Sequence, residues 1–212
     1  MTWLKRHNPV TYFALRIILW LPFCLFLWYF FAPTLVWPLS ILTDWIMVAL
    51  FPDVIGEIMQ LENRMDVVTT LPLPEEVRAG LPLGYTGDLV FTLNPLIYSY
   101  GLPLYTALVI ASVDEEGEKW RRWLWGLPLL LLIQLWGISL DILKTLLFNL
   151  GAEIANQLTF SPLQKEIVAL GYQLGYLILP PVVPVMIWAV FFRDFIVNLV
   201  WGCSESETKT MG

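Results

Sequence analysis

Long uncharged runs alternate with short polar segments along this chain, which predicts a protein that crosses a membrane several times. Four runs lack Asp, Glu, Lys and Arg: Ile17 to Thr43, Leu89 to Val113, Trp123 to Leu140 and Ile167 to Phe192. A spanning helix needs about 20 apolar residues. We therefore predict membrane helices at about 17–36, 95–113, 123–143 and 167–192, within one membrane domain of 212 residues.

The segment at 39–93, between the first two predicted spans, has a different pattern. Its first part, SILTDWIMVALFPDVIGEIMQLE, is apolar with acidic residues at intervals, which favours a helix lying in the outer membrane interface. RMDVVTTLPL and GDLVFTL follow, rich in β-branched residues and separated by prolines and glycines. They predict a small extracytoplasmic β-hairpin with a long loop. A two-stranded hairpin is marginally stable alone, so it should rest on the membrane domain.

Capping residues predict where two of the helices begin. Asn94 is a good N-cap and Pro95 suits a first helical turn, so NPLIYSYGLPLYTALVIAS should start a helix where the second strand ends. Ser161, Pro162 and Gln164 have the pattern of a capping box ahead of the fourth span. Residues 203–212 are polar and are expected to form a disordered cytoplasmic tail.

Cations gather on the segments that should face the cytoplasm. They flank the first span and occupy DEEGEKWRRW, a short charged loop between the second and third, whereas Asp44 to Asp88 has only Arg64 and Arg78 against eight carboxylates. By the positive-inside rule, both termini should be cytoplasmic. The first span is long and aromatic with no cleavage site behind it, so we expect an uncleaved anchor. The net charge of -6 is then mostly extracytoplasmic, which argues against a nucleic-acid partner.

Residues for familiar catalytic or metal chemistry are sparse. His7 is the only histidine, and Cys24 and Cys203 are far apart along the predicted topology. We therefore expect no metal or cofactor, and no catalytic residue can be assigned from these positions.

Polar residues inside the predicted spans are the better candidates, because burying them in lipid is costly. Gln134 lies at mid-membrane and could hydrogen-bond between helices. Asp141 and Lys144 share a helix face and could form an ion pair. That pair either reaches water near the outer interface or serves a proton relay or catalysis.

Tyrosines and glycines gather near the outer ends of the spans. Gly171 and Gly175 have G-x-x-x-G spacing, which permits close helix approach. The tyrosines serve either as an aromatic belt and packing or in recognition of a peptide or lipid headgroup. They are Tyr98, Tyr100, Tyr105, Tyr172 and Tyr176.

The order of the predicted elements is itself informative. An outer hairpin runs into a membrane helix, and a short charged loop, a helix with the LPL pattern and a last helix with an outer polar cluster follow. This order resembles the exosortase and archaeosortase superfamily of membrane transpeptidases, which carry a Cys-Ser-Gly motif after the strand, then an Asn and an Arg, then a His. Here Asn94 and Pro95 stand at the cysteine motif. Gln134 and Gly137 stand near the Asn and the Arg, and Gln173 stands in the His region.

NPLIYSYGLPLY and ALGYQLGYLILPPVVPV more closely resemble the exosortase H-associated membrane proteins, over roughly Leu61 to Arg193. The resemblance implies an accessory protein of the inner membrane of Gram-negative bacteria, without the catalytic Cys, Arg and His. Its partners would be membrane lipid, an exosortase and proteins with C-terminal sorting signals. The implied outer pocket is lined by Asn94, Tyr98, Tyr100, Gln134, Gly137, Tyr172 and Gln173.

Two other functions stay open at this point. One is an intramembrane or interfacial enzyme that uses Asp141 and Lys144, and the other is a structural subunit of a different inner-membrane complex.

Overall fold

The structure, a computed structural model, describes residues 9–72, 88–113 and 116–208. Within these ranges, four helical segments are long and apolar enough to cross a membrane, and Leu96–Ala111 is a shorter apolar helix. The four segments are Pro9–Phe30, Ala32–Leu50, Glu116–Asn149 and Pro162–Phe191. A small antiparallel sheet is the β component. The predicted class, a helical membrane protein with a small β element, is confirmed.

The elements follow one another in this order: α1 (Pro9–Phe30), α2 (Ala32–Leu50), β1 (Ile55–Leu61), β2 (Arg64–Thr69), β3 (Leu89–Leu93), α4 (Leu96–Ser99), α5 (Gly101–Ala111), α6 (Glu116–Lys144), the π-helix η2 (Thr145–Asn149), α7 (Ala152–Gln157), α8 (Pro162–Gln173), the π-helix η3 (Leu174–Ile178), α9 (Leu179–Phe191) and α10 (Arg193–Thr208). The chain divides into two compact units. The first comprises residues 1–30, 100–130 and 181–212, and the second comprises residues 31–99 and 131–180.

The core of the first unit is aromatic, and the polar groups of Tyr105 and Trp188 are hydrogen-bonded within it. Tyr105 is fully buried, and its hydroxyl donates to the carbonyl of Arg122 at 2.9 Å. Gly126 makes room for this ring, because a Cβ there would overlap it. The indole N–H of Trp188 donates to Ser112 Oγ at 2.8 Å. Tyr105 is therefore a core residue rather than a member of the outer tyrosine group.

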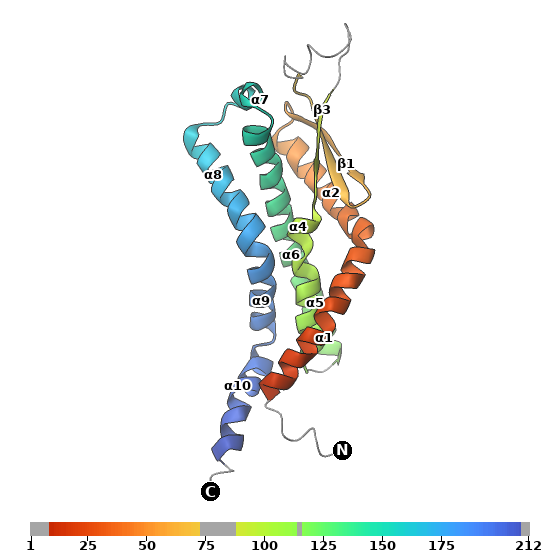
Figure 1. Cartoon of the computed structure of the whole chain (residues 1–212), viewed down its shortest axis with the longest axis vertical. Helices are drawn as coiled ribbons and strands as arrows, with labels where there is room; N and C mark the ends of the chain where they lie inside the picture. Colours follow the sequence, from red (N-terminus) through yellow and green to blue (C-terminus); the bar gives the residue numbers. More distant parts are fainter. Residues whose placement is uncertain (1–8, 73–87, 114–115, 209–212) are drawn as a thin grey trace. The chain divides into compact units, whose positions relative to one another are not determined.

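The second unit contains the sheet, which has three strands in the order β1-β2-β3 rather than two. β1 lies beside α2, as Figure 1 shows. The backbone N–H of Ile58 donates to Asp44 Oδ1 on α2 at 2.7 Å. The predicted helix is wrong in its extent, because α2 ends at Leu50 and the residues after it form β1, whereas its position in the interface stays a prediction.

The first predicted span, at 17–36, is divided between two helices. α1 ends at Phe30 and α2 begins at Ala32, with proline in its first turn. Pro33 lacks an N–H, so it suits the start of a helix rather than its interior.

Two polar segments are more helical than predicted. α6 begins at Glu116, so most of the segment predicted as a charged loop forms the first turns of this helix. α10 continues to Thr208, so part of the predicted tail is helical as well. Lys5, Arg6 and His7, and most of the loop between β2 and β3, lie outside the described residues.

Both predicted helix starts are confirmed. The N–H of Leu96 donates to Asn94 Oδ1 at 3.1 Å, ahead of α4. At α8, the N–H of Gln164 donates to Ser161 Oγ at 3.3 Å, and the N–H of Ser161 donates to Gln164 Oε1 at 2.8 Å. These two bonds complete the capping box.

Candidate functional site

Three tyrosines, a carboxylate and an ammonium group meet in the second unit, and we call them the Tyr98 cluster: Tyr98, Asp141, Lys144, Tyr172 and Tyr176. Tyr98 comes from α4, Asp141 and Lys144 from α6, Tyr172 from α8 and Tyr176 from η3. The side chains of Tyr98 and Asp141 are hydrogen-bonded. Lys144 Nζ lies 4.8 Å from the ring centroid of Tyr172. Tyr172 stacks on Tyr176 at 5.8 Å and 9°, and Tyr176 meets Tyr98 edge-on at 6.5 Å and 67°.

Two glycines let the helices approach closely enough to form this cluster. A Cβ at Gly175 would lie 3.1 Å from Gly137 Cα, and a Cβ at Gly137 would overlap the Tyr98 ring. A Cβ at Gly171 would lie 2.6 Å from Leu140 Cδ1. The close approach expected from the G-x-x-x-G spacing is confirmed.

Both long helices change to π-helix beside the cluster. η2 begins directly after Lys144, and η3 begins directly after Gln173. Pro180 and Pro181 supply no N–H to the carbonyls one turn earlier, which favours irregular hydrogen bonding in η3. Single π turns inside α-helices are frequent at functional sites. η3 lies inside the helical segment Pro162–Phe191 and therefore singles out this region, whereas η2 is the last turn of its helix.

The charges of the cluster are compensated locally. Asp141 accepts from Tyr98 and interacts electrostatically with Lys144, whose ammonium group lies over the Tyr172 ring. Tyr98 is 3% exposed, so its bond to Asp141 is shielded from solvent. Among the residues that the structure describes, no group of three or more His, Cys, Asp or Glu could hold a metal ion. Phenol, carboxylate and ammonium groups at this position can bind or orient a polar group.

The predicted pocket residues are distributed over several places. The structure brings together Tyr98, Gly137 and Tyr172, along with Asp141 and Lys144. Gln134 is buried on α6, Asn94 is exposed and caps α4, and Tyr100 belongs to the first unit as the N-cap residue of α5. Gln173 is exposed on α8. Within the described part of the second unit, neither Asn94 nor Gln173 takes part in the hydrogen bond and the ring contacts that join the cluster.

Gln173 instead lines an apolar groove, which we call the Gln173 groove. It has a volume of about 590 Å³, and Gln173 is the only polar side chain among its described lining residues. The others are Trp136, Ile167, Leu170, Gly171, Leu174, Leu177 and Ile178. Sequence reasoning missed this surface, although Leu170, Leu174 and Leu177 recur at helical spacing and the structure leaves all three exposed.

Comparison with known proteins gives a match to a family. The profile of the family described as exosortase H-associated membrane protein matches residues 7–195. No curated protein and no solved structure matches the chain.

Proposed function

This chain belongs to the exosortase H-associated membrane protein family, and on that premise we propose that it is a non-catalytic, exosortase-like accessory protein of the bacterial inner membrane. It assists a transpeptidase system that processes proteins with C-terminal sorting signals. It does so by binding the enzyme or the C-terminal helix of its substrate. Both termini face the cytoplasm, and the sheet faces outward.

The packing around Gly137 is the observation that carries the non-catalytic part of this proposal. In the related transpeptidases, the position near Gly137 is an arginine. Here the ring of Tyr98 occupies the space that any side chain at Gly137 would need. Asn94, at the position of the nucleophile motif, serves as a helix cap. Residues at the former catalytic positions thus support the fold.

The Gln173 groove is the surface that we assign to a partner's membrane helix. Residues 167–178 extend about 16 Å along the helix axis, roughly half of a bilayer's hydrocarbon core. Trp136 forms one wall of the groove, and exposed leucines of α8 and η3 form the surface beside it. Gln173 offers a hydrogen bond that lipid tails cannot satisfy, which favours a protein partner.

Co-purification from native membranes tests this proposal. An exosortase, or a protein with a C-terminal sorting signal, should be recovered with the unaltered chain. Leu177→Trp should reduce that recovery by filling the groove from a side chain that is 61% exposed. Leu132→Trp, at a 63% exposed position outside the groove, is the matched control and should retain the partner. Recovery of the unaltered protein without such a partner would contradict the proposal.

The polar contacts of the Tyr98 cluster favour a second candidate, an enzyme that uses Asp141 and Lys144. A carboxylate held beside a phenol and an ammonium group has the components of acid–base catalysis. This candidate predicts that Asp141→Asn abolishes processing of sorting-signal proteins in cells while the variant keeps its stability and its partner. The accessory function predicts that Asp141→Asn acts through lower stability and lower abundance.

A further inference from the structure

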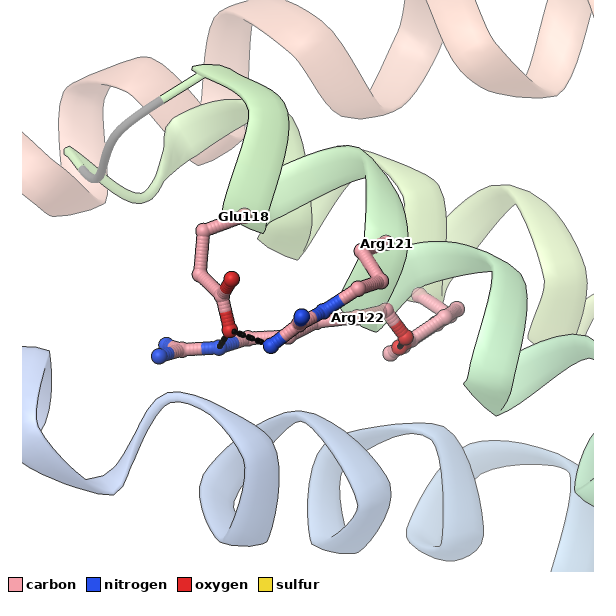
Figure 2. A network of polar contacts seen from close by, with 4 residues as sticks. Glu118, Arg121 and Arg122 are labelled. Carbon is pink, nitrogen blue, oxygen red and sulfur yellow. Dashed lines mark hydrogen bonds and ion pairs between the residues drawn. The ribbon is translucent and has the colours of Figure 1, made fainter.

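A separate polar site lies in the first unit, at the start of α6. Figure 2 shows two guanidinium groups that converge on one carboxylate oxygen of Glu118. Arg121 Nη2 lies 2.6 Å from Glu118 Oε1, and Arg122 Nε lies 3.4 Å from the same atom. The three side chains, with Trp125 and Phe191, line a recess of about 400 Å³. Two positive groups and one negative group therefore line the recess.

This recess lies at the level where two membrane-length segments end. The charges of α6 stop at Arg122, and no charged residue follows from Trp123 to Leu140. Phe191 is the last residue of the segment Pro162–Phe191. Trp125 is 69% exposed. Charged turns that meet an apolar run, with exposed tryptophan between them, are typical of the membrane–water interface.

The side chain of Arg122 is more buried than that of Arg121, and it also contacts an aromatic ring. The Arg122 side chain is one-quarter exposed, and its guanidinium carbon lies 5.4 Å from the ring centroid of Phe192. The Arg121 side chain is two-thirds exposed. An exposed ion pair contributes little stability, and a phosphate binds a guanidinium group with two parallel hydrogen bonds. A phosphate can therefore replace Glu118 as the partner of Arg121 while Arg122 stays in position.

We propose that this recess binds the headgroup phosphate of an anionic phospholipid. The phosphate contacts Arg121 and Arg122, and the acyl chains lie along Trp125 and the apolar run that follows it. The rings of Trp125 and Phe191 favour a lipid over a soluble anion, since they offer apolar surface beside the charges. This inference rests on the first unit alone and does not depend on the accessory function.

Lipid titration of the full-length protein, followed by native mass spectrometry, tests the inference. The purified protein in a neutral detergent is titrated with phosphatidylglycerol or with phosphatidylcholine of the same acyl chains. We expect phosphatidylglycerol to bind about fivefold more tightly for each arginine that contacts it. Arg121→Gln should remove about fivefold of this preference, whereas Lys165→Gln, the same charge change in the second unit, should leave it unaltered.

Glu118→Gln supplies the opposite test, because it removes the carboxylate that competes with the phosphate. This variant should bind phosphatidylglycerol more tightly than the unaltered protein does. It therefore tests whether the lipid phosphate competes with Glu118 for the arginines even if Arg121→Gln does not fold. Equal binding of the two lipids, or a preference that survives Arg121→Gln, would overturn the inference. Displacement of the lipid by inorganic phosphate at the same concentration would also overturn it, since the recess would then bind a soluble anion.

Discussion

The ring of Tyr98 occupies the space beside α6 that a side chain at Gly137 would need. The hydroxyl of the same tyrosine is hydrogen-bonded to Asp141 on that helix. One side chain thus fixes α4 against α6 by both its ring and its polar tip. Because the first contact depends on the absence of a methyl group, a small substitution tests the packing directly.

Gly137→Ala should lower the thermal unfolding temperature of the protein in detergent. Overpacking a filled contact costs about 1–3 kcal/mol, which exceeds the gain of about 1 kcal/mol from helix propensity. Gly117→Ala is the matched control, because nothing lies within 4 Å of a Cβ at that position. The Gly117→Ala variant should unfold at the same temperature as the unaltered protein or at a higher one. Equal shifts for the two variants would show that the Tyr98 ring does not fill this space.

Tyr98→Phe should reduce the free energy of unfolding by about 1–3 kcal/mol, because Asp141 loses its buried donor. Combined with Asp141→Asn in a double-mutant cycle, the two effects should be non-additive by at least about 0.5 kcal/mol. Tyr29→Phe removes a hydroxyl from a side chain that is 63% exposed, and it should have little effect. Additive effects of Tyr98→Phe and Asp141→Asn in a denaturant titration would rule out the hydrogen bond.

Lys144→Met should destabilise the protein, whereas Lys144→Arg should preserve most of its stability. The ammonium group lies over the Tyr172 ring, and a cation–π contact contributes about 0.5–2 kcal/mol. Arginine keeps the positive charge and can stack on the same ring. Lys165→Met controls for the loss of a charge elsewhere in the second unit. If Lys144→Met and Lys165→Met unfold at the same temperature, the contact has no energetic role.

The orientation predicts which side of the membrane each turn faces. With Cys24 and Cys203 replaced, Glu62→Cys in the exposed turn between β1 and β2 should react with an impermeant maleimide on spheroplasts. Gly117→Cys, exposed at the start of α6, should react only after the inner membrane is opened. The reverse labelling pattern would place the termini outside.

Helix starts could be predicted from the sequence because their interactions are local. The Ser161 and Gln164 capping box and the Asn94 cap each involve residues two or three positions apart. Such contacts depend on residue type and spacing alone, so they are present in the pattern of the chain.

The extent of α2 and the existence of β1 could not be predicted in the same way. Acidic residues at intervals in an apolar segment, with Asp44 the first of them, favoured a helix in the outer interface. In the structure, Asp44 accepts the backbone N–H of Ile58, and this partner becomes available only once β1 has formed. The partner of Asp44 thus comes from a tertiary contact, which the local sequence pattern does not contain.

In the candidate site, too, local spacing could be predicted from the sequence and tertiary contacts could not. The shared helix face of Asp141 and Lys144 follows from their spacing. Their partners, Tyr98 and Tyr172, come from other helices, and the glycines that admit these rings have no polar signature. The spacing therefore predicts that Asp141 and Lys144 lie near each other, but it does not predict the rings around them.

A photo-crosslinking amino acid at position 173, in native membranes, tests the central claim most directly. The accessory function predicts a covalent adduct from the Gln173 groove, identified by mass spectrometry as an exosortase or as a protein with a C-terminal sorting signal. The same amino acid at Leu132, exposed outside the groove, should give no such adduct. If position 173 yields only lipid adducts, or the same products as position 132, the groove does not receive a partner's helix and the claim is contradicted.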